Sequence, residues 1–194
     1  MKYKHEVSGL QSEQIRQELD RERYKHRYRE TLRSTVYALI TAAAVAILVA
    51  TLWLPVLQIY GSSMSPTLFE GDIVVSLKSK KHEPGDIVAF YYGNKLLVKR
   101  YIAGPGTWVH ITDDGDVIVN DVKLDEPYVE EKALGICDID LPYQVPEERH
   151  FLMGDLRETS VDSRSSAVGC ISNEEIVGTI VFRVWPLSRF GPVE

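Results

Sequence analysis

Three short segments of the sequence carry side chains that could do chemistry together. The first is GSSMSPTL, residues 61–68, which offers serine hydroxyls in a loop closed by a Ser-Pro turn. The second is LLVKRYI, residues 96–102, which places a lysine within an apolar run. The third is MGDLRETSVDSR, residues 153–164, which concentrates hydroxyl, carboxylate and guanidinium groups. A serine and a lysine that has lost its proton can act as a nucleophile and its general base.

The lysine of the second segment is the most informative of these residues. Alternation along a strand puts Lys99 on one face with Leu97 and Tyr101, whereas Arg100 points the other way. One of two adjacent cations is therefore expected in apolar surroundings. Burial disfavours the charged form, so a lysine held there would lose its proton more readily, as a general base at neutral pH requires. The ordinary alternative is a lysine that extends its amine to solvent at a sheet edge.

The other two segments also have ordinary structural explanations. A serine-rich loop is most often a polar turn, and a charged loop usually reflects ion pairs within a turn, although a hydroxyl there could fix a catalytic lysine. Histidine and metal chemistry fit less well, because all five histidines lie outside the three segments and no HExxH spacing occurs. We therefore expect no Ser-His-Asp triad, no metal site and no cofactor.

A long apolar run precedes the first segment. No residue between Arg33 and Glu70 is charged. Residues 36–57 would form a helix of about 33 Å at ~1.5 Å per residue, enough to cross a hydrocarbon core about 30 Å thick. We expect one transmembrane helix within residues 35–58. A cleaved secretory signal is the alternative, but the charged leader and the apolar run are both too long, and no small-x-small site follows.

Charge on either side of the run predicts its orientation. Residues 1–34 hold nine Lys or Arg and six acids, whereas the remaining residues hold thirteen and twenty-two, the first cation after the run being Lys78. This bias puts the leader, residues 1–34, in the cytoplasm and residues 59–194 outside the plasma membrane. The leader, a short helix or a solvated tail, is expected to contact anionic lipid. The acidic outer part offers no basic surface for nucleic acid.

After residue 60 the sequence predicts strands and no helix. Runs rich in Val, Ile, Tyr and Phe alternate with Gly, Pro and Asp, and an Asp-Gly pair in HITDDGDVIVN indicates a hairpin. The expected fold is mostly β, with an antiparallel sheet in residues 59–194 and a smaller β subdomain at about 107–149. Cys137 and Cys170 are too few for a disulfide framework, and whether they pair stays open. The predicted strands start at Ile73, Asp86, Leu96, Thr107, Val117 and Ile176.

Taken together, the three segments resemble those of bacterial type I signal peptidases, membrane-anchored serine proteases that cut signal peptides from exported proteins. The resemblance includes the anchor and continues, in the family's order, through PGDIVAF, VKRYIAGPG, VNDVKLDEPYV and EEIVGTIVFRVWP. Lysine rather than histidine in the second segment is similar to the bacterial branch. Gly61 stands where many relatives have a serine and is similar to Gram-positive relatives.

The resemblance implies roles for individual residues. Ser63 would be the nucleophile, with its amide as an oxyanion donor, and Lys99 the general base. Supporting roles would fall to Ser160, which orients the lysine amine, and to the ion pairs of Asp162 with Arg164 and of Asp155 with Arg100. Pockets for small residues before the cut would be lined by Leu57, Ile59, Met64, Leu68, Ala89, Leu97 and Val98.

The partners implied are exported preproteins and the lipid bilayer. Three other functions are alternatives to this one. A peptidase dedicated to a narrow set such as pilin precursors would have the same motifs. A noncatalytic anchored β domain that binds precursors is disfavoured because Ser63 and Lys99 are both present. A self-cleaving repressor-like Ser-Lys protease is disfavoured by the apolar anchor and by the lack of a DNA-binding element.

Overall fold

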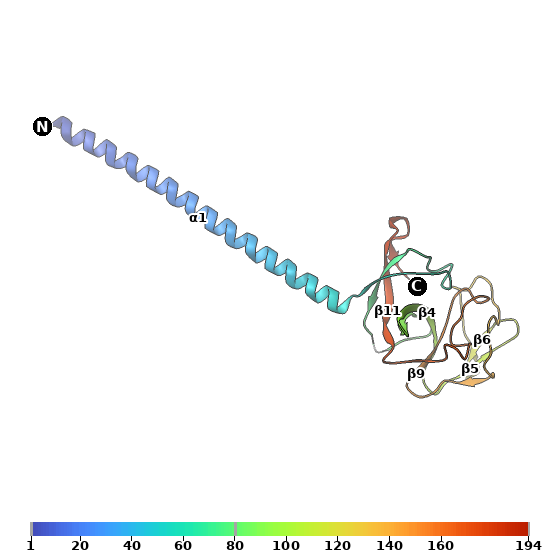
Figure 1. Cartoon of the computed structure of the whole chain (residues 1–194). Coiled ribbons are helices and arrows are strands. Elements are labelled where there is room, and N and C mark those ends of the chain that lie inside the picture. The colour runs from blue at the N-terminus through green and yellow to red at the C-terminus, as the bar shows by residue number, and fades with distance from the viewer. Residues whose placement is uncertain (1, 80, 194) are drawn as a thin grey trace. The chain divides into compact units, whose positions relative to one another are not determined.

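The computed structural model of the chain describes the backbone of residues 2–79 and 81–193, and their side chains except in residues 2–13, 15 and 50–53. Its N-terminal unit is one long helix, α1 (Lys2–Trp53; Figure 1). Within Arg16–Val49 this helix is long and apolar enough to cross a membrane, and no part of the apolar window is buried against protein. An apolar helix that is not buried in protein needs another apolar environment, such as the hydrocarbon core of a lipid bilayer.

The helix ends earlier than the apolar run does. It was predicted to continue to Leu57, but α1 ends at Trp53 and residues Val56–Gln58 form strand β1. Pro55 explains the difference, because proline lacks a backbone donor and keeps the preceding residue out of the helical conformation. The leader, for which helix and tail were both open, belongs to α1 from Lys2 onward. The domain limits 1–34, 35–58 and 59–194 stay predictions.

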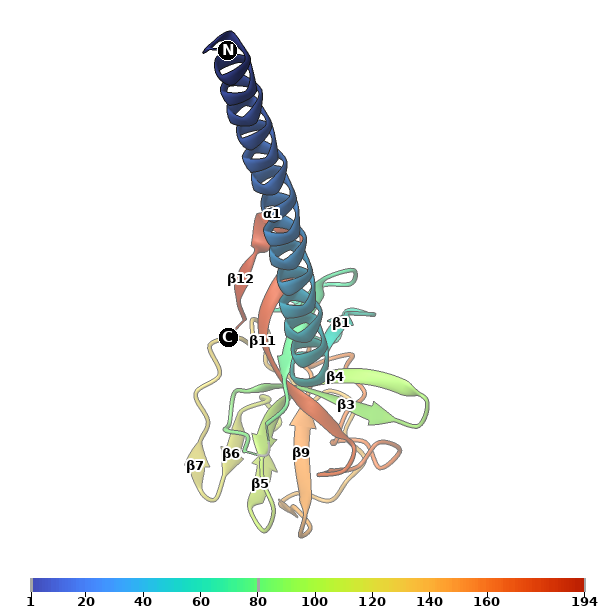
Figure 2. The same ribbon diagram turned by 90° about the vertical axis from the view of Figure 1, so that its left-hand side faces the viewer.

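From Thr51 the described chain forms a second unit with two antiparallel sheets (Figures 1 and 2). The strand order of the larger sheet is β1-β2-β11-β3-β4-β9-β10, with β12 paired to β11, and that of the smaller sheet is β7-β6-β5-β8. The larger sheet contains β2 (Ile73–Leu77), β3 (Ile87–Tyr92), β4 (Lys95–Ala103), β9 (Arg149–Met153), β10 (Ile171–Ser172), β11 (Ile176–Trp185) and β12 (Gly191–Pro192). The smaller sheet contains β5 (Trp108–Ile111), β6 (Val117–Val119), β7 (Val122–Lys123) and β8 (Tyr143–Gln144).

The predicted fold class is confirmed: one apolar N-terminal helix precedes a mostly β domain of antiparallel sheets. Each of the six predicted runs contains a strand, and the Asp-Gly pair joins β5 to β6 with Ile111 opposite Val117. The smaller sheet lies within residues 107–149, where the subdomain was predicted. The runs did not predict β9, whose last residue, Met153, begins the third chemical segment. Cys137 and Cys170 are both free thiols.

The two sheets share one hydrophobic cluster. Ile102 of β4 and Phe151 and Met153 of β9 pack with Val109 and Val117 of the smaller sheet, and all five are at most 2% exposed. Figure 2 shows β5 and β6 beside β9, in agreement with these contacts. The smaller sheet therefore has no separate core, and its position depends on β4 and β9.

Strand β4 lies inside the larger sheet between β3 and β9. Alternation predicted one of its two adjacent cations in apolar surroundings, and Lys99 is 4% exposed. Arg100 is also buried, at 1% exposed, because both faces of this interior strand are covered. A charged group at such a position needs a partner. Arg100 has one in Asp155, which follows β9.

A buried ion pair also joins the smaller sheet to the segment after β9. Glu126, just beyond β7, accepts a hydrogen bond from Arg157 at 2.5 Å, and neither side chain is exposed. Two residues further on, the ring of Tyr128 lies 3.8 Å from the guanidinium carbon of Arg100. The Glu126–Tyr128 segment therefore contacts two buried cations, Arg100 of β4 and Arg157 of the segment after β9.

Removing one member of this buried pair should destabilise the domain. We expect Glu126→Ala to lower the free energy of unfolding by roughly 3–5 kcal/mol, because Arg157 is left buried without a counter-charge. Glu126→Gln, which keeps a hydrogen-bond acceptor, should cost less. Denaturant unfolding of the full chain in detergent measures both. The exposed neighbour Glu130 is the control, since Glu130→Ala should change stability by about 0.5 kcal/mol or less. Equal losses at both positions would contradict the assignment.

Candidate active site

Ser63 lies in a turn that directly follows β1. The turn leaves the strand through Gly61, whose φ of +80° is in the left-handed region that glycine adopts without strain. The Ser65 amide donates to the Ser62 carbonyl at 2.9 Å and the Leu68 amide to the Met64 carbonyl at 2.8 Å, which fixes the turn on both sides of Ser63. In the described part of the chain no hydrogen bond uses the Ser63 amide or hydroxyl. Both groups are therefore available to a substrate.

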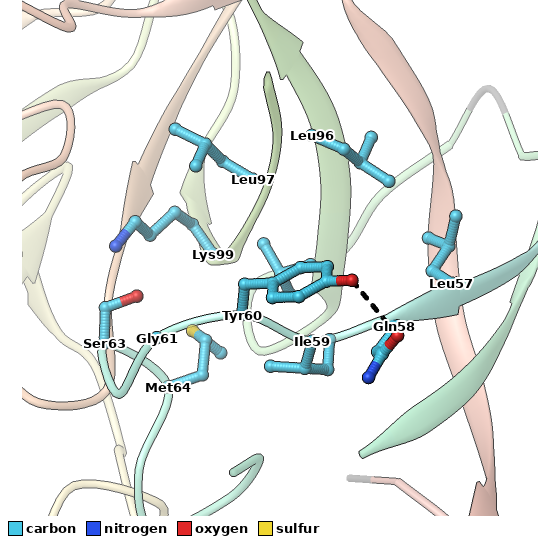
Figure 3. Close-up of a pocket in the computed structure, with 11 residues that line it drawn as sticks. Leu57, Gln58, Ile59, Tyr60, Gly61, Ser63, Met64, Leu96, Leu97 and Lys99 are labelled. Carbon is cyan, nitrogen blue, oxygen red and sulfur yellow. Dashed lines mark hydrogen bonds between the residues drawn. The ribbon is translucent and has the colours of Figure 1, made fainter. Parts of the chain in front are cut away.

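Lys99 of β4 approaches the same place from the sheet. Its amine donates a hydrogen bond to Ser160 Oγ at 2.8 Å, and Ser160 is 1% exposed. Figure 3 shows the Ser63 hydroxyl and the Lys99 amine at the same end of a cavity. Within the described residues no hydrogen bond links these two groups. The structure thus brings Ser63, Lys99 and Ser160 together from three segments distant in sequence.

The surroundings of Lys99 favour its neutral form. Burial lowers the pKa of the amine from 10.5 to about 8, against the carboxylate of Asp162, which raises it. Arg164 lowers this pKa further and Asp155 raises it. Desolvation is the largest of these effects and disfavours an ammonium ion. The unprotonated fraction of this lysine near neutral pH is therefore much larger than that of an exposed lysine, although the ammonium form still predominates at pH 7.

Asp162 and Arg164 hold the loop that carries Ser160. Their side chains are fully buried and form an ion pair of 2.8 Å. Asp162 also accepts from the amide of Gly154 at 2.9 Å, and Arg164 donates to the carbonyls of Leu134 at 2.7 Å and Ser160 at 3.4 Å. The pair thereby fixes the backbone on both sides of the Lys99 partner.

Arg100 and Asp155 connect the sheet to the serine loop. The guanidinium contacts the carboxylate through two hydrogen bonds, of 2.7 and 3.1 Å, and donates to the Gly85 carbonyl at 2.7 Å. Thr67, from the segment that contains Ser63, donates to the same carboxylate at 2.5 Å. Asp155 is therefore shared by β4 and the serine loop, and it holds the two parts in register.

The roles of Gly154 and Thr67 at this site were not predicted from the sequence. A Cβ on Gly154 would lie 2.6 Å from the Ser63 carbonyl oxygen and would also collide with Ser160, so only glycine lets the two segments meet. The Leu156 amide then donates to that same carbonyl at 3.1 Å. A glycine at the end of a strand can signal such a close backbone approach, and Met-Gly-Asp offered that signal. Nothing in the local sequence pointed to Thr67.

The cavity beside Ser63 and Lys99 is small, with a volume of about 30 Å³. Five of the seven predicted pocket residues line it, namely Leu57, Ile59, Met64, Leu97 and Val98. The other two, Leu68 and Ala89, are completely buried and do not line it. Ser63 and Lys99 also line it, together with four residues that were not predicted for the pocket, Gln58, Tyr60, Gly61 and Leu96. Tyr60 donates a hydrogen bond to the Gln58 side chain at 3.1 Å (Figure 3).

Comparisons with known proteins agree on one family. The family model described as signal peptidase, peptidase S26, matches residues 32–185. Signal peptidase IB of Staphylococcus aureus strain COL is 37% identical over 152 residues, covering 68% of this chain and 78% of that protein. Thylakoidal processing peptidase 1 of Arabidopsis thaliana is 36% identical over 149 residues, covering 68% of this chain and 42% of that protein.

A crystal structure of signal peptidase I from Enterococcus faecalis V583 is similar over 51% of this chain and 96% of that one, with 28% identity and a TM-score of 0.42. The family model spans more than half of the chain, and its limits enclose all three chemical segments. The chain therefore belongs to the signal peptidase family, peptidase S26.

Proposed function

We propose that this peptidase removes N-terminal signal peptides from exported preproteins through a Ser63/Lys99 dyad. The observation that carries the proposal is the buried Lys99 amine, with a pKa of about 8, beside the Ser63 turn. Lys99 takes the hydroxyl proton as Ser63 Oγ attacks the scissile carbonyl, and then gives that proton to the leaving amine. The Ser63 amide stabilises the oxyanion. Water then releases the acyl group by the same base.

Histidine is not needed for this chemistry. His82 and His150 both pack against the ring of Tyr101, at centroid distances of 5.7 and 5.4 Å. They also contact Thr179 and Asn173 through hydrogen bonds of 3.0 and 2.6 Å. These partners occupy the two rings, and neither histidine lines the cavity at Ser63, which supports lysine as the base.

The small cavity supports a substrate with small residues before the cut. A volume of about 30 Å³ holds roughly two water-sized probes, which suits a methyl group and not a long side chain. The substrate chain would lie extended and pair with strand edges beside the cavity, since backbone pairing supplies affinity and shallow pockets supply selection. The predicted pocket residues Leu68 and Ala89 would then act only by packing behind the lining.

The membrane supplies the other part of the proposal. Residues 1–34 form a cytoplasmic leader, the apolar run predicted at residues 35–58 crosses the plasma membrane as far as the end of α1 at Trp53, and residues 59–194 act outside it. The excess of Lys and Arg before the apolar run favours this orientation. The link from the end of α1 to Ser63 is short, residues 54–62. The substrate's own apolar helix in the bilayer would bring the scissile bond to a site near the membrane surface.

The first prediction concerns the dyad. Ser63→Ala and Lys99→Ala should each lower kcat on a preprotein by roughly a thousandfold or more, and the double variant should be scarcely worse, because the two residues act as one unit. Lys99→Arg should also fail, since a guanidinium keeps its proton. Cleavage by the detergent-solubilised full chain measures this. Near-normal turnover by any of these variants would contradict the assignment of the dyad. Binding of a precursor without cleavage by the wild type would favour the noncatalytic alternative.

A second prediction concerns Ser160 as a positioning residue. Ser160→Ala should reduce kcat about ten- to a hundredfold with little effect on KM, because the Lys99 amine loses the hydroxyl that orients it. Ser160→Thr, which keeps a hydroxyl, should recover part of the loss. Ser166→Ala in the same loop is the control, because Ser166 is exposed and bonds to Asp138 instead. Equal losses in the two alanine variants would mean that the loop matters only for stability.

The third prediction concerns pH. Because Lys99 must be neutral to act and its pKa is about 8, kcat/KM should rise with pH, bend near pH 8 and become flat above it. Leu97→Asn should move the bend to higher pH by admitting water around the amine. Asp155→Asn should move it lower, because a carboxylate that favours the ammonium ion is lost. The exposed position Leu77→Asn is the control. An acid limb that none of these changes moves would argue against desolvation.

A further inference from the structure

A second cavity borders Lys99, and Ser63 does not line it. Its volume is about 510 Å³, and it is lined by Leu97, Lys99, Val161 and Val168 together with the β3–β4 turn. The small cavity described above shares Leu97 and Lys99 with it and is lined by Ser63, which the larger one is not. Leu97 and Lys99 therefore belong to the walls of two cavities of very different size.

The walls of the larger cavity are already held in place. Tyr92, at the end of β3, donates a hydrogen bond to the Ala167 carbonyl at 2.6 Å, which joins the β3–β4 hairpin to the loop that carries Val161 and Val168. Val168 packs on the buried cluster that contains Phe90. Val161 directly follows Ser160 and is 47% exposed, so its side chain is an accessible part of the wall. A pocket formed in advance binds a side chain without first ordering the loop.

The chemistry of the dyad indicates which part of a substrate lies there. In the proposed reaction the same lysine that accepts the serine proton must give a proton to the nitrogen of the leaving chain. That nitrogen must come within hydrogen-bond reach of Lys99 Nζ, so the chain after the cut leaves past the lysine. The residues before the cut remain attached to Ser63, on the side of the small cavity.

We propose that the larger cavity binds an apolar side chain from the first two residues after the cut. The proposal rests on the proposed Ser63/Lys99 function and adds a specificity site to it. The cavity is wide enough for a leucine or phenylalanine side chain, and Leu97, Val161 and Val168 offer apolar surface to it. Lys95 also lines the cavity but is exposed, so solvent screens its charge. The enzyme would then select small side chains before the cut and prefer a large apolar side chain after it.

The experiment compares peptides that are identical up to the cut, with alanine in the last position before it. Leucine, phenylalanine, serine or aspartate is placed at the first or the second position after the cut, and the detergent-solubilised full chain cleaves each peptide. At one of the two positions kcat/KM should be roughly tenfold higher for the large apolar residue than for serine, as burial of such a side chain implies. Equal kcat/KM for all residues at both positions would overturn the proposal.

Val161→Ser tests whether this cavity is the cause. It should reduce the preference for the large apolar residue several-fold and leave cleavage of the serine peptide nearly unchanged. Val122→Ser is the matched control, since Val122 is an exposed valine of β7 outside the cavity. A preference that Val161→Ser leaves intact would refute the site while the dyad stands. Cleavage that persists in Ser63→Ala would instead refute the proposed function, and this site with it.

Discussion

The burial of one lysine amine, that of Lys99, is the constraint on which the arrangement of the residues around it depends. Lys99 is 4% exposed, and the loss of water around its amine is the main reason that its pKa falls to about 8. Burial of that kind needs an interior strand with both faces covered, which β4 provides between β3 and β9. A lysine at a sheet edge would keep its water and its proton. The lowered pKa of this amine is thus a consequence of where β4 lies in the sheet.

A framework of paired charges makes this burial possible without leaving other charges alone. Arg100, next to the lysine, is neutralised by Asp155, while Asp162 and Arg164 neutralise one another beside Ser160. Single buried charges are very unfavourable, but pairs with further hydrogen bonds can be accommodated. Each pair also contacts backbone of a neighbouring segment. The same contacts that cancel charge therefore fix the serine turn, the strand and the Ser160 loop relative to one another.

Close packing determines how near these segments come. The backbone of Ser63 lies against Gly154, where a Cβ would be 2.6 Å from the carbonyl oxygen. Leu97 and Lys99 line two cavities, of about 30 and 510 Å³, whose shapes follow from the same packing.

The sequence alone determined the elements and the residue types of the site. Hydrophobic periodicity and turn chemistry are local properties, so they can be recognised in the sequence. They predicted an uncharged apolar run, six β-rich runs, a lysine on an apolar strand face and two charged or hydroxyl-rich loops. The resemblance to signal peptidases then selected Ser63 and Lys99 from these segments. The end of α1 was misplaced by four residues, since the apolar pattern continues past Pro55 into a strand.

Only the tertiary structure decided which side chains meet. Lys99 contacts Ser160, which is 61 residues away in the sequence, and Arg100 contacts Asp155, which is 55 residues away. Local sequence patterns do not predict contacts between residues so far apart in the chain. Burial of Arg100, the need for glycine at position 154 and the two unequal cavities depend on strand order and register. Those are set by the packing of the whole β domain, because a side chain's exposure and neighbours belong to the sheet that contains it and not to the segment that carries it.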